Sequence, residues 1–310
     1  MASVKIGVLL WPQTSSWPDI RDAAALADRS GAASLWTWDH LNSIVGPWEG
    51  PIFEGWSILA GWSQVTERAT LGLMVAANTF RNPGLTAKLA TTLDHLSGGR
   101  AVLGLGGAWF EREHEAYGID FGSGFGERLD RLDEAVMLVR RLLDGETVTH
   151  EGPVYPMRDA LVTPRPVQVK LPIMIGGSGP KKTLRTLATY GDQWNSMGEL
   201  SKLAERDAIL REHCATIGRD DAEIERTTTV DIVIRDTHEA GLAYYKDRLT
   251  ANGEEFDPDW NFFVGTPADI AQGVAPLLAL GFRHVLIDMP APYDTETIGR
   301  LGELLELLNA

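Results

Sequence analysis

Short apolar runs alternate with longer segments of helical periodicity along the whole of this 310-residue chain. Such alternation is typical of βα units, in which each strand joins a parallel sheet and the helix that follows covers it. Eight runs are predicted as strands. They lie at residues 5–10, 34–38, 70–76, 101–105, 172–175, 193–197, 230–234 and 284–289.

The segments between these runs carry the sequence signals of helix ends. Ser16 and Asp19 have the spacing of a capping box, and Pro267 stands at the favoured first position of another helix. No Gly/Ser-rich linker, fixed repeat or low-complexity tract interrupts the alternation. We therefore expect one domain of the α/β class over residues 1–310, in which eight βα units close into a (β/α)8 TIM barrel rather than an open sheet.

Two connections in this barrel are longer than ordinary loops. They are residues 108–125, after the fourth strand, and about 242–262, before the penultimate helix. Long insertions in barrels usually build or cover the active site, so we expect substrate specificity to depend on them. Trp48 and Trp260 are candidates for the substrate side, although surface packing explains both equally well.

Charge and cysteine content narrow the choice of partners. The formal net charge is −15, from 28 basic and 43 acidic residues. Nucleic acid and anionic membranes are bound chiefly through Lys and Arg, so both are poor partners and a small-molecule substrate is expected. Cys214 is the only cysteine, which leaves no internal disulfide, and no segment reaches the ~20 apolar residues of a membrane span. These features predict a cytoplasmic protein.

The active site of a barrel forms at the carboxyl ends of its strands, so the residues after each run are the candidates. Asp39 and His40 follow the second strand. His40 is a candidate for proton transfer because the reference pKa of histidine, ~6.5, lies close to neutrality. For these two residues by themselves, a purely structural pair is the simpler interpretation.

A glycine-rich segment follows the fifth predicted strand and leads into a helix. Gly residues at 176, 177 and 179 would let backbone N–H groups converge on an anion, and the helix dipole would add positive potential. A phosphate is the ligand that this pattern favours. A plain glycine-rich turn with lysines facing water explains it too. The basic residues gathered there are Lys181, Lys182 and Arg185.

Aromatic residues at the strand ends are candidates to contact a flat ring system. Trp38 and Trp109 are assigned to this role, whereas Trp36 and Phe80 are assigned to core packing.

Other catalytic classes have little support in the sequence. Glu111, His114 and Glu115 have the spacing of metal ligands on one helical face, but a solvated helix face explains them more simply. No metal site is therefore expected. The chain has no H-E-x-x-H or G-x-S-x-G motif, and its first βα turn lacks G-x-G-x-x-G. These absences argue against a zinc protease, a serine hydrolase and a Rossmann nucleotide site.

Six stretches that cover most of the chain carry a family pattern. They are TWDHL (37–41), the stretch 50–122 that begins GPIFEGW and ends GIDFG, ERLDRLDEAV (127–136), TPRPVQ (163–168), PIMIGGSGPKKTLRTLATYGDQWN (172–195) and VGTPADI (264–270). Together they resemble the luciferase-like monooxygenase superfamily, whose fold is the bacterial-luciferase-like barrel. The resemblance is to its branch of probable F420-dependent oxidoreductases.

The resemblance implies a ring-shaped cofactor in the barrel mouth. Asp39 and His40 match the pair that contacts the deazaflavin ring, with His40 as the proton donor or anion stabiliser. Met74 and Val75 match a strand bulge at which the family carries a non-prolyl cis peptide beneath the ring. Asn78 matches a polar position beside the ring. The implied phosphate cradle consists of Gly176, Gly177, Ser178 and Gly179, and further cofactor contacts are assigned to Trp38, Gly106, Gly107, Ala108 and Lys181.

One position departs from a known variant of this pattern. Some deazaflavin dehydrogenases have a catalytic glutamate after the fourth strand, where this chain has Trp109. The difference argues against a sugar-phosphate dehydrogenase of the glutamate-bearing kind and makes Trp109 a candidate catalytic residue.

The activity implied by the resemblance is hydride transfer between a small organic substrate and coenzyme F420. The alternative is an FMN-dependent luciferase-like monooxygenase that uses reduced flavin and oxygen, because the fold serves both chemistries. A degenerate barrel that binds without turnover is disfavoured, since the Asp39–His40 pair and the glycine cradle are intact. By analogy we expect a homodimer, with contacts through residues 55–65 and 85–96.

Overall fold

Eight parallel strands close into a barrel in the computed structural model, which describes residues 3–257 and 261–310. The ring closes because β12 pairs with β1 on one side and with β10 on the other. This is the (β/α)8 barrel that the sequence predicts. In order around the ring the strands are β1 (Lys5–Leu10), β2 (Ser34–Thr37), β3 (Thr70–Leu73), β5 (Ala101–Gly106), β8 (Ile173–Gly176), β9 (Gln193–Asn195), β10 (Glu225–Ile234) and β12 (His284–Met289).

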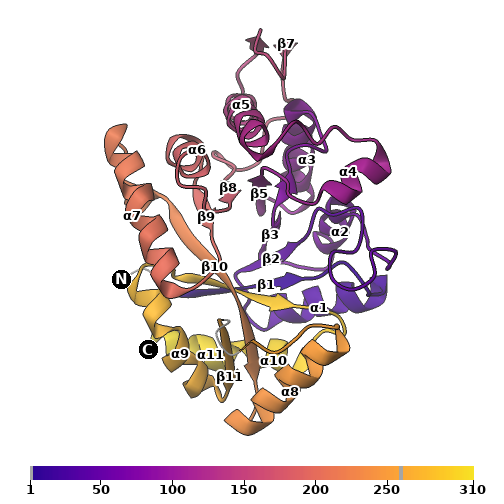
Figure 1. Cartoon of the computed structure of the whole chain (residues 1–310), viewed down its shortest axis with the longest axis vertical. Helices are drawn as coiled ribbons and strands as arrows, with labels where there is room; N and C mark the ends of the chain where they lie inside the picture. Colours follow the sequence, from indigo (N-terminus) through magenta and orange to yellow (C-terminus); the bar gives the residue numbers. More distant parts are fainter. Residues whose placement is uncertain (1–2, 258–260) are drawn as a thin grey trace.

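Helices surround the strands on the outside of the barrel (Figure 1). α1 shows why: Ile20, Ala23, Ala24 and Ala27 are buried, and their spacing puts them on one helical face toward the sheet. The helices are α1 (Trp17–Arg29), α2 (Gly55–Trp62), α3 (Pro83–Leu96), α4 (Glu111–Tyr117), α5 (Phe125–Leu143), α6 (Thr183–Tyr190), α7 (Leu200–Thr216), α8 (His238–Ala251), α9 (Pro267–Ala279), α10 (Thr295–Gly299) and α11 (Leu301–Asn309).

Both predicted helix starts are confirmed. The Ser16 side chain accepts a hydrogen bond from the Asp19 backbone N–H at the start of α1. α9 begins with a complete capping box, in which Thr266 and Asp269 satisfy each other's backbone N–H groups. These local signals fix where the helices begin because they supply acceptors to N–H groups that have no partner within the helix.

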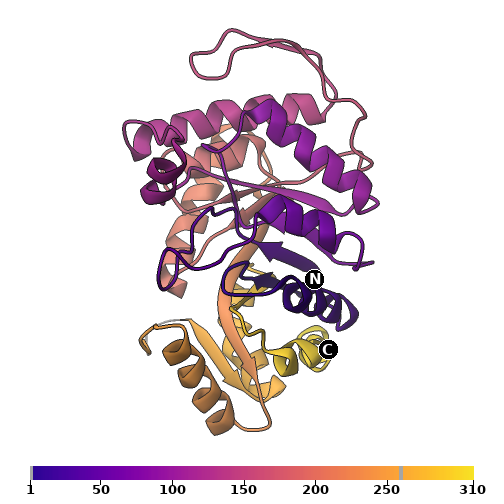
Figure 2. The same ribbon diagram turned by 90° about the vertical axis from the view of Figure 1, so that its right-hand side faces the viewer.

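Additional strands lie outside the predicted eight. β6 (Val148–His150) and β7 (Met157–Ala160) form an antiparallel hairpin that projects from the body of the molecule in both ribbon views (Figures 1 and 2). β11 (Phe262–Gly265) pairs with the C-terminal part of β10. A short strand, β4 (Ala76–Ala77), follows β3 and pairs with β5, so the predicted strand 70–76 is divided in two.

The second predicted insertion is shorter than expected. α8 extends to Ala251, so the first ten residues of the predicted insertion 242–262 are helical, and β11 begins at Phe262. The helix was missed because its buried positions include Gly241, Tyr245 and Arg248, which give no apolar period. Trp260 lies outside the described residues. The first insertion, 108–125, contains the short helix α4.

The core consists mainly of strand residues and the inner faces of the helices. Trp36, Trp62 and Trp194 are fully buried, as predicted for Trp36. None of the described helices is both long enough and apolar enough to cross a membrane.

Candidate active site

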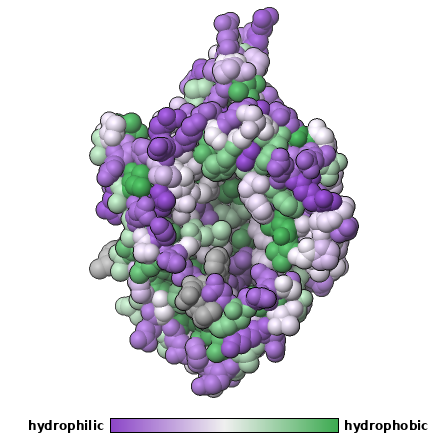
Figure 3. Space-filling model, viewed as in Figure 1, coloured by the Kyte–Doolittle hydropathy of each residue, from purple (hydrophilic) through white to green (hydrophobic). Residues whose placement is uncertain are grey.

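A cavity of about 710 Å³ lies at the carboxyl ends of the barrel strands, where the chain is hollowed in the space-filling view (Figure 3). The structure brings together all of the predicted site residues there except Asn78 and Lys181. Those that line the cavity are Trp38, Asp39, His40, Met74, Val75, Gly106, Gly107, Ala108, Trp109, Gly176, Gly177, Ser178 and Gly179.

Glycines packed closely against Val75 form one wall of this cavity. The Met74–Val75 peptide bond is cis, as the resemblance implies. A Cβ atom added at Gly106 would lie 2.6 Å from Cγ2 of Val75, and one at Gly176 would lie 3.0 Å from the same side chain. Only glycine therefore lets β5 and β8 approach Val75 so closely. We call the surface formed by Val75, Gly106, Gly107 and Gly176 the glycine wall.

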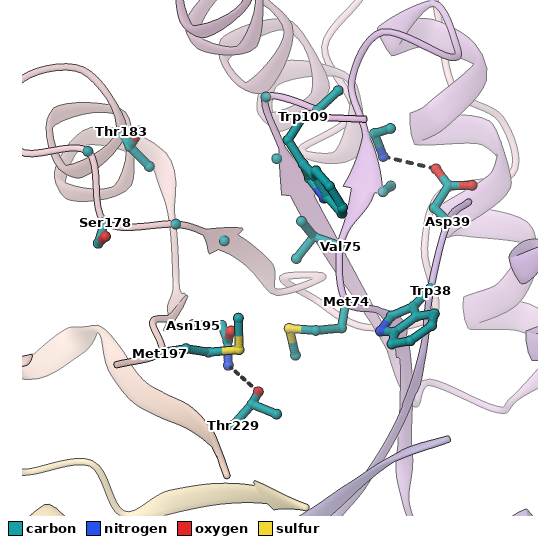
Figure 4. Close-up of a pocket in the computed structure, with 18 of the residues that line it drawn as sticks. Trp38, Asp39, Met74, Val75, Trp109, Ser178, Thr183, Asn195, Met197 and Thr229 are labelled. Atoms are coloured by element: carbon teal, nitrogen blue, oxygen red, sulfur yellow. Dashed lines mark hydrogen bonds between the residues drawn. The ribbon is translucent and has the colours of Figure 1, made fainter. Parts of the chain in front are cut away.

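The loop after β8 leads into a helix whose first turn has no side-chain cap. Lys182 occupies the N-cap position of α6 without a capping hydrogen bond. Gly177 has a φ of +108°, which glycine adopts at little cost. Ser178 and Thr183 lie at one end of the cavity and Trp38 at the other (Figure 4). An uncapped helix start beside a cavity is suited to a phosphate.

The lysines of this loop do not reach the cavity. Lys181 is exposed and does not line it, so its predicted contact with a cofactor tail has no support in this geometry. Lys182 is paired with Asp130 at 2.6 Å, and Arg185 lies 3.8 Å from Asp133. Besides His40, a basic side chain that lines the cavity is Arg206 from α7. His213 of the same helix forms a 2.7 Å hydrogen bond with the Pro180 carbonyl of the loop. Sequence reasoning missed Arg206 because it is far from the motif.

His40 is held by a buried carboxylate that the sequence did not single out. Its Nδ1 lies 2.9 Å from Oε1 of Glu113, whose other oxygen accepts a hydrogen bond from the Leu41 backbone N–H at 2.8 Å. Glu113 is only 1% exposed. Among the described residues Nε2 of His40 has no hydrogen-bond partner. A His whose Nδ1–H donates to a carboxylate presents Nε2 as the group that can take or give a proton.

Glu113 belongs to α4, the helix whose residues Glu111, His114 and Glu115 have the spacing of metal ligands. His114 of that helix is buried and bonded to Thr79 at 2.6 Å, while Glu111 and Glu115 are exposed. These three side chains do not converge, and no cluster of metal-ligating side chains occurs in residues 3–257 and 261–310. A search for buried rather than exposed carboxylates on α4 would have pointed to Glu113.

Asp39 lines the cavity but its carboxylate is fully engaged. Arg81 donates two hydrogen bonds to it, at 2.7 and 2.9 Å, and the Ala77 backbone N–H donates a third at 2.9 Å. Burial raises the pKa of Asp39, and the charge of Arg81 opposes that rise. Arg81 also contacts Glu54, the N-cap of α2, at 3.1 Å. Asp39 therefore ties the ends of β2 and β4 together.

Asn78 is buried next to the cavity rather than in its wall. Its side chain donates to the Tyr155 hydroxyl at 3.1 Å, and its backbone N–H bonds the Gly106 carbonyl. Its predicted place beside a ring is thus taken by a link to the hairpin that carries Tyr155. Trp48 does not line the cavity either; it is 41% exposed and packs under Arg112.

The wall across from the glycines was not predicted at all. Leu9, Thr229 and Asp288 line the cavity from β1, β10 and β12. The Trp11 indole donates to Oδ1 of Asp288 at 2.5 Å. Burial, and then the charge of Asp231, raise the pKa of Asp288 to about 7. The available signal was Asp288 among the apolar residues that follow His284 in β12. The sequence analysis considered only the residues that follow the second to fifth strands.

Comparisons with known proteins agree on one family. The profile of the family described as luciferase-like monooxygenase matches residues 4–275. The chain is 30% identical over 307 residues to a phthiodiolone/phenolphthiodiolone dimycocerosates ketoreductase of Mycobacterium tuberculosis, covering 90% of this chain and 75% of that one. It is 28% identical to an F420-dependent glucose-6-phosphate dehydrogenase of Microbacterium testaceum, covering 92% and 91%.

Solved structures share the fold at lower identity. An F420-dependent secondary alcohol dehydrogenase in complex with an F420–acetone adduct superposes with a TM-score of 0.83, at 19% identity over the whole of both chains. A riboflavin lyase with modified FMN and riboflavin superposes with a TM-score of 0.84, at 18% identity over 99% of this chain and 91% of that one. At these identities the likeness shows a common barrel.

Proposed function

This chain belongs to the luciferase-like monooxygenase family, and we propose that it is an oxidoreductase that transfers a hydride between the deazaflavin coenzyme F420 and a small organic substrate. The names of two similar proteins, the glucose-6-phosphate dehydrogenase and the secondary alcohol dehydrogenase, support F420 over FMN.

The observation that carries this proposal is the glycine wall next to an uncapped helix start in one cavity. A flat ring needs a surface with few side chains, and three glycines line this wall; a Cβ atom at Gly106 or Gly176 would displace Val75, which also lines the cavity. A phosphate needs free backbone N–H groups. The start of α6 has no side-chain cap, although the Leu184 N–H donates to the Gly179 carbonyl and the Gly177 N–H to the Asn195 carbonyl. The residues present therefore fit a ring joined to a phosphate tail.

When bound, F420 supplies a ring carbon that takes or gives a hydride. The protein's own contribution is binding, orientation and proton transfer. Glu113 fixes the orientation of His40, and Nε2 of His40 then serves as the proton acceptor or donor for the substrate oxygen. Trp109, whose ring lies 5.6 Å from that of His40, would close the cavity over the reacting groups.

The second candidate is an FMN-dependent monooxygenase. It is favoured by the family itself and by the cradle before α6, which suits the phosphate of FMN as well as that of F420.

Cofactor choice is tested by titrating the purified protein with F420 and, in parallel, with FMN, following the quenching of tryptophan fluorescence. We expect tight quenching by F420 and weak quenching by FMN. Gly106→Ala should weaken F420 binding about tenfold, because the added Cβ atom would lie 2.6 Å from Cγ2 of Val75 and displace a side chain that lines the cavity. Gly299→Ala is the matched control, since nothing lies within 4 Å of a Cβ atom there. Tight quenching by FMN alone would replace the F420 proposal with the monooxygenase.

The role of His40 is tested separately from binding. His40→Ala should abolish turnover and leave the dissociation constant of F420 nearly unchanged. His150→Ala is a matched control, because His150 pairs with Glu134 away from the cavity. Turnover that survives in His40→Ala would remove His40 from the catalytic role.

We also propose that the enzyme works in the cytoplasm as a homodimer, with α2 and α3 at the contact. The exposed apolar side chains Val65, Leu85 and Leu96 on and beside these helices support that surface.

A further inference from the structure

Asp288 lies across the barrel from the glycine wall. In the closed ring, β12 is four strands from β5 in either direction, through β1, β2 and β3 or through β10, β9 and β8. Asp288 therefore faces the end of β5, where Gly106 and Gly107 lie, from the opposite side of the same cavity. A molecule in contact with a ring on the glycine wall would have Asp288 on its other side.

The Asp288 side chain has one free oxygen. Within the described residues its hydrogen-bond partner is the Trp11 indole, which donates to Oδ1. Asp288 is partly exposed, whereas Ile287 and Met289 on either side are fully buried. Asp288 lines the cavity, and no hydrogen bond from a described residue engages its Oδ2. Trp11 is itself held in place against Trp38, with the ring centroids 4.5 Å apart.

The charges behind Asp288 favour its neutral form. Asp231 of β10 and Glu254, which follows α8, bring negative charge, and Arg248 of α8 offsets part of it while paired with Asp231. With burial, this environment raises the pKa of Asp288 to about 7. A carboxyl group with such a pKa can donate a hydrogen bond to an oxygen atom near neutral pH, and as a carboxylate it can accept one.

Among the described residues, the same wall offers no positive charge to an anionic substrate. Leu9, Thr229 and Asp288 line it, and Ile44 and Trp38 extend it on the side of β2. The basic side chains in the cavity lining are His40, which is bonded to Glu113, and Arg206, which comes from α7. A phosphate placed against Asp288 would meet a carboxyl group and apolar side chains, with its charge uncompensated.

We propose that Asp288 is the substrate-anchoring residue and that the substrate is an uncharged compound bound through a hydroxyl or carbonyl oxygen, not a phosphorylated one. This inference rests on the proposed function, which puts the cofactor ring on the glycine wall. The proposed substrate class differs from the phosphorylated sugar in the name of the relative, a glucose-6-phosphate dehydrogenase.

The test follows Trp11, because its indole N–H contacts Asp288 directly. The protein is labelled with 5-fluorotryptophan, and the Trp11 fluorine signal is assigned by its loss in Trp11→Phe. We expect this signal to titrate near neutral pH in the wild type and not in Asp288→Asn. The F420-loaded protein is then titrated with C3 to C10 alcohols and ketones and, separately, with glucose 6-phosphate. The uncharged compounds should shift the signal, and glucose 6-phosphate should not.

Variants decide whether Asp288 is the anchor. In Asp288→Asn and Asp288→Ser the affinity for the responding alcohol or ketone should fall at least about tenfold, while the affinity for F420 stays within about twofold. Asp236→Asn makes the same chemical change on the outer surface and should alter neither affinity. The wild-type comparison of compound classes stands even where a variant fails to fold.

Three results would overturn the inference: a stronger response to glucose 6-phosphate than to any alcohol or ketone, no response to any uncharged compound, or full affinity in both Asp288 variants. Failure of the proposed function is distinguished by the F420 titration, because F420 would then not bind to the wild type. The measurement without F420 would still report whether uncharged compounds contact Asp288.

Discussion

The orientation of the His40 ring depends on a partner that is distant in sequence. The sequence singled out His40, but Glu113, 73 positions away, sets which ring nitrogen is presented to the cavity. A histidine with the same neighbours in sequence and no buried carboxylate would rotate freely and gain little as a catalyst. The candidate site is therefore a pair, of which the sequence revealed one member.

Glu113→Gln is expected to lower kcat about 10-fold to 100-fold and to change KM and F420 affinity much less. The reason is that the amide cannot hold His40 in one tautomer as the carboxylate does. Steady-state kinetics and the F420 titration measure the two effects. Glu115→Gln, on the exposed side of the same helix, is the control and should have neither effect. An unchanged kcat in Glu113→Gln would show that the pair is structural.

Asp288 predicts a particular dependence of stability on pH. Its pKa is raised from 3.8 to about 7, so between these values the folded state keeps a proton that the unfolded state has lost. The wild type therefore loses stability as pH rises from about 4 to 7, and no further loss from this group occurs above that. Asp288→Asn should gain about 1–3 kcal/mol relative to the wild type between pH 4 and pH 8. Urea unfolding at both pH values measures this, and a constant difference would contradict it.

At the scale of elements, helix starts were the best-predicted features. Ser16 and Pro267 marked two helix starts in the sequence, and α1 and α9 begin there, capped by Ser16 and Thr266. α8 was missed, because its buried face carries Tyr245 and Arg248 in place of apolar residues. A helix start can be predicted from sequence because the capping interaction is local. A buried helix face cannot be predicted when its burial depends on side chains of another element.

Thr266→Ala should lower the free energy of unfolding by about 1 kcal/mol, because the first turn of α9 then loses its capping hydrogen bond. Chemical denaturation measures the loss. F420 affinity should not change, since Thr266 is not part of the cavity lining. Ser201→Ala is a control at the start of α7, where no side-chain cap is formed. Equal stability of the Thr266 variant and the wild type would argue against the capping box.

At the scale of the whole molecule, the proposed homodimer makes α2 and α3 the surface to examine. Leu85 and Leu96 are 52% and 46% exposed at opposite ends of α3. We expect gel filtration with light scattering to give the mass of a dimer at micromolar concentration. Leu85→Glu should shift it to a monomer, because the charge would be buried at the contact. Leu307→Glu, 49% exposed on α11, is the control. A monomeric wild type would overturn the proposal.

The barrel and most of one wall of its cavity could be predicted from local patterns and the family resemblance. Apolar runs and helix signals act over a few residues, so they can be read in order along the chain. The resemblance then assigned residues after the second to fifth strands, and most of these do line the cavity. Lys181 and Asn78 did not follow, since a lysine can turn to solvent and a buried amide bonds to whichever neighbour the fold provides, in this case Tyr155.

The opposite wall, with Leu9, Thr229 and Asp288, could be identified only from the contacts between strands. Asp288 and Trp11 are 277 positions apart, and they meet because β12 closes the ring against β1. The pKa of Asp288 and the pairing of His40 with Glu113 both depend on which strands become neighbours on closure. Closure of the barrel requires the complete set of strands, so it cannot be predicted from any short stretch of sequence.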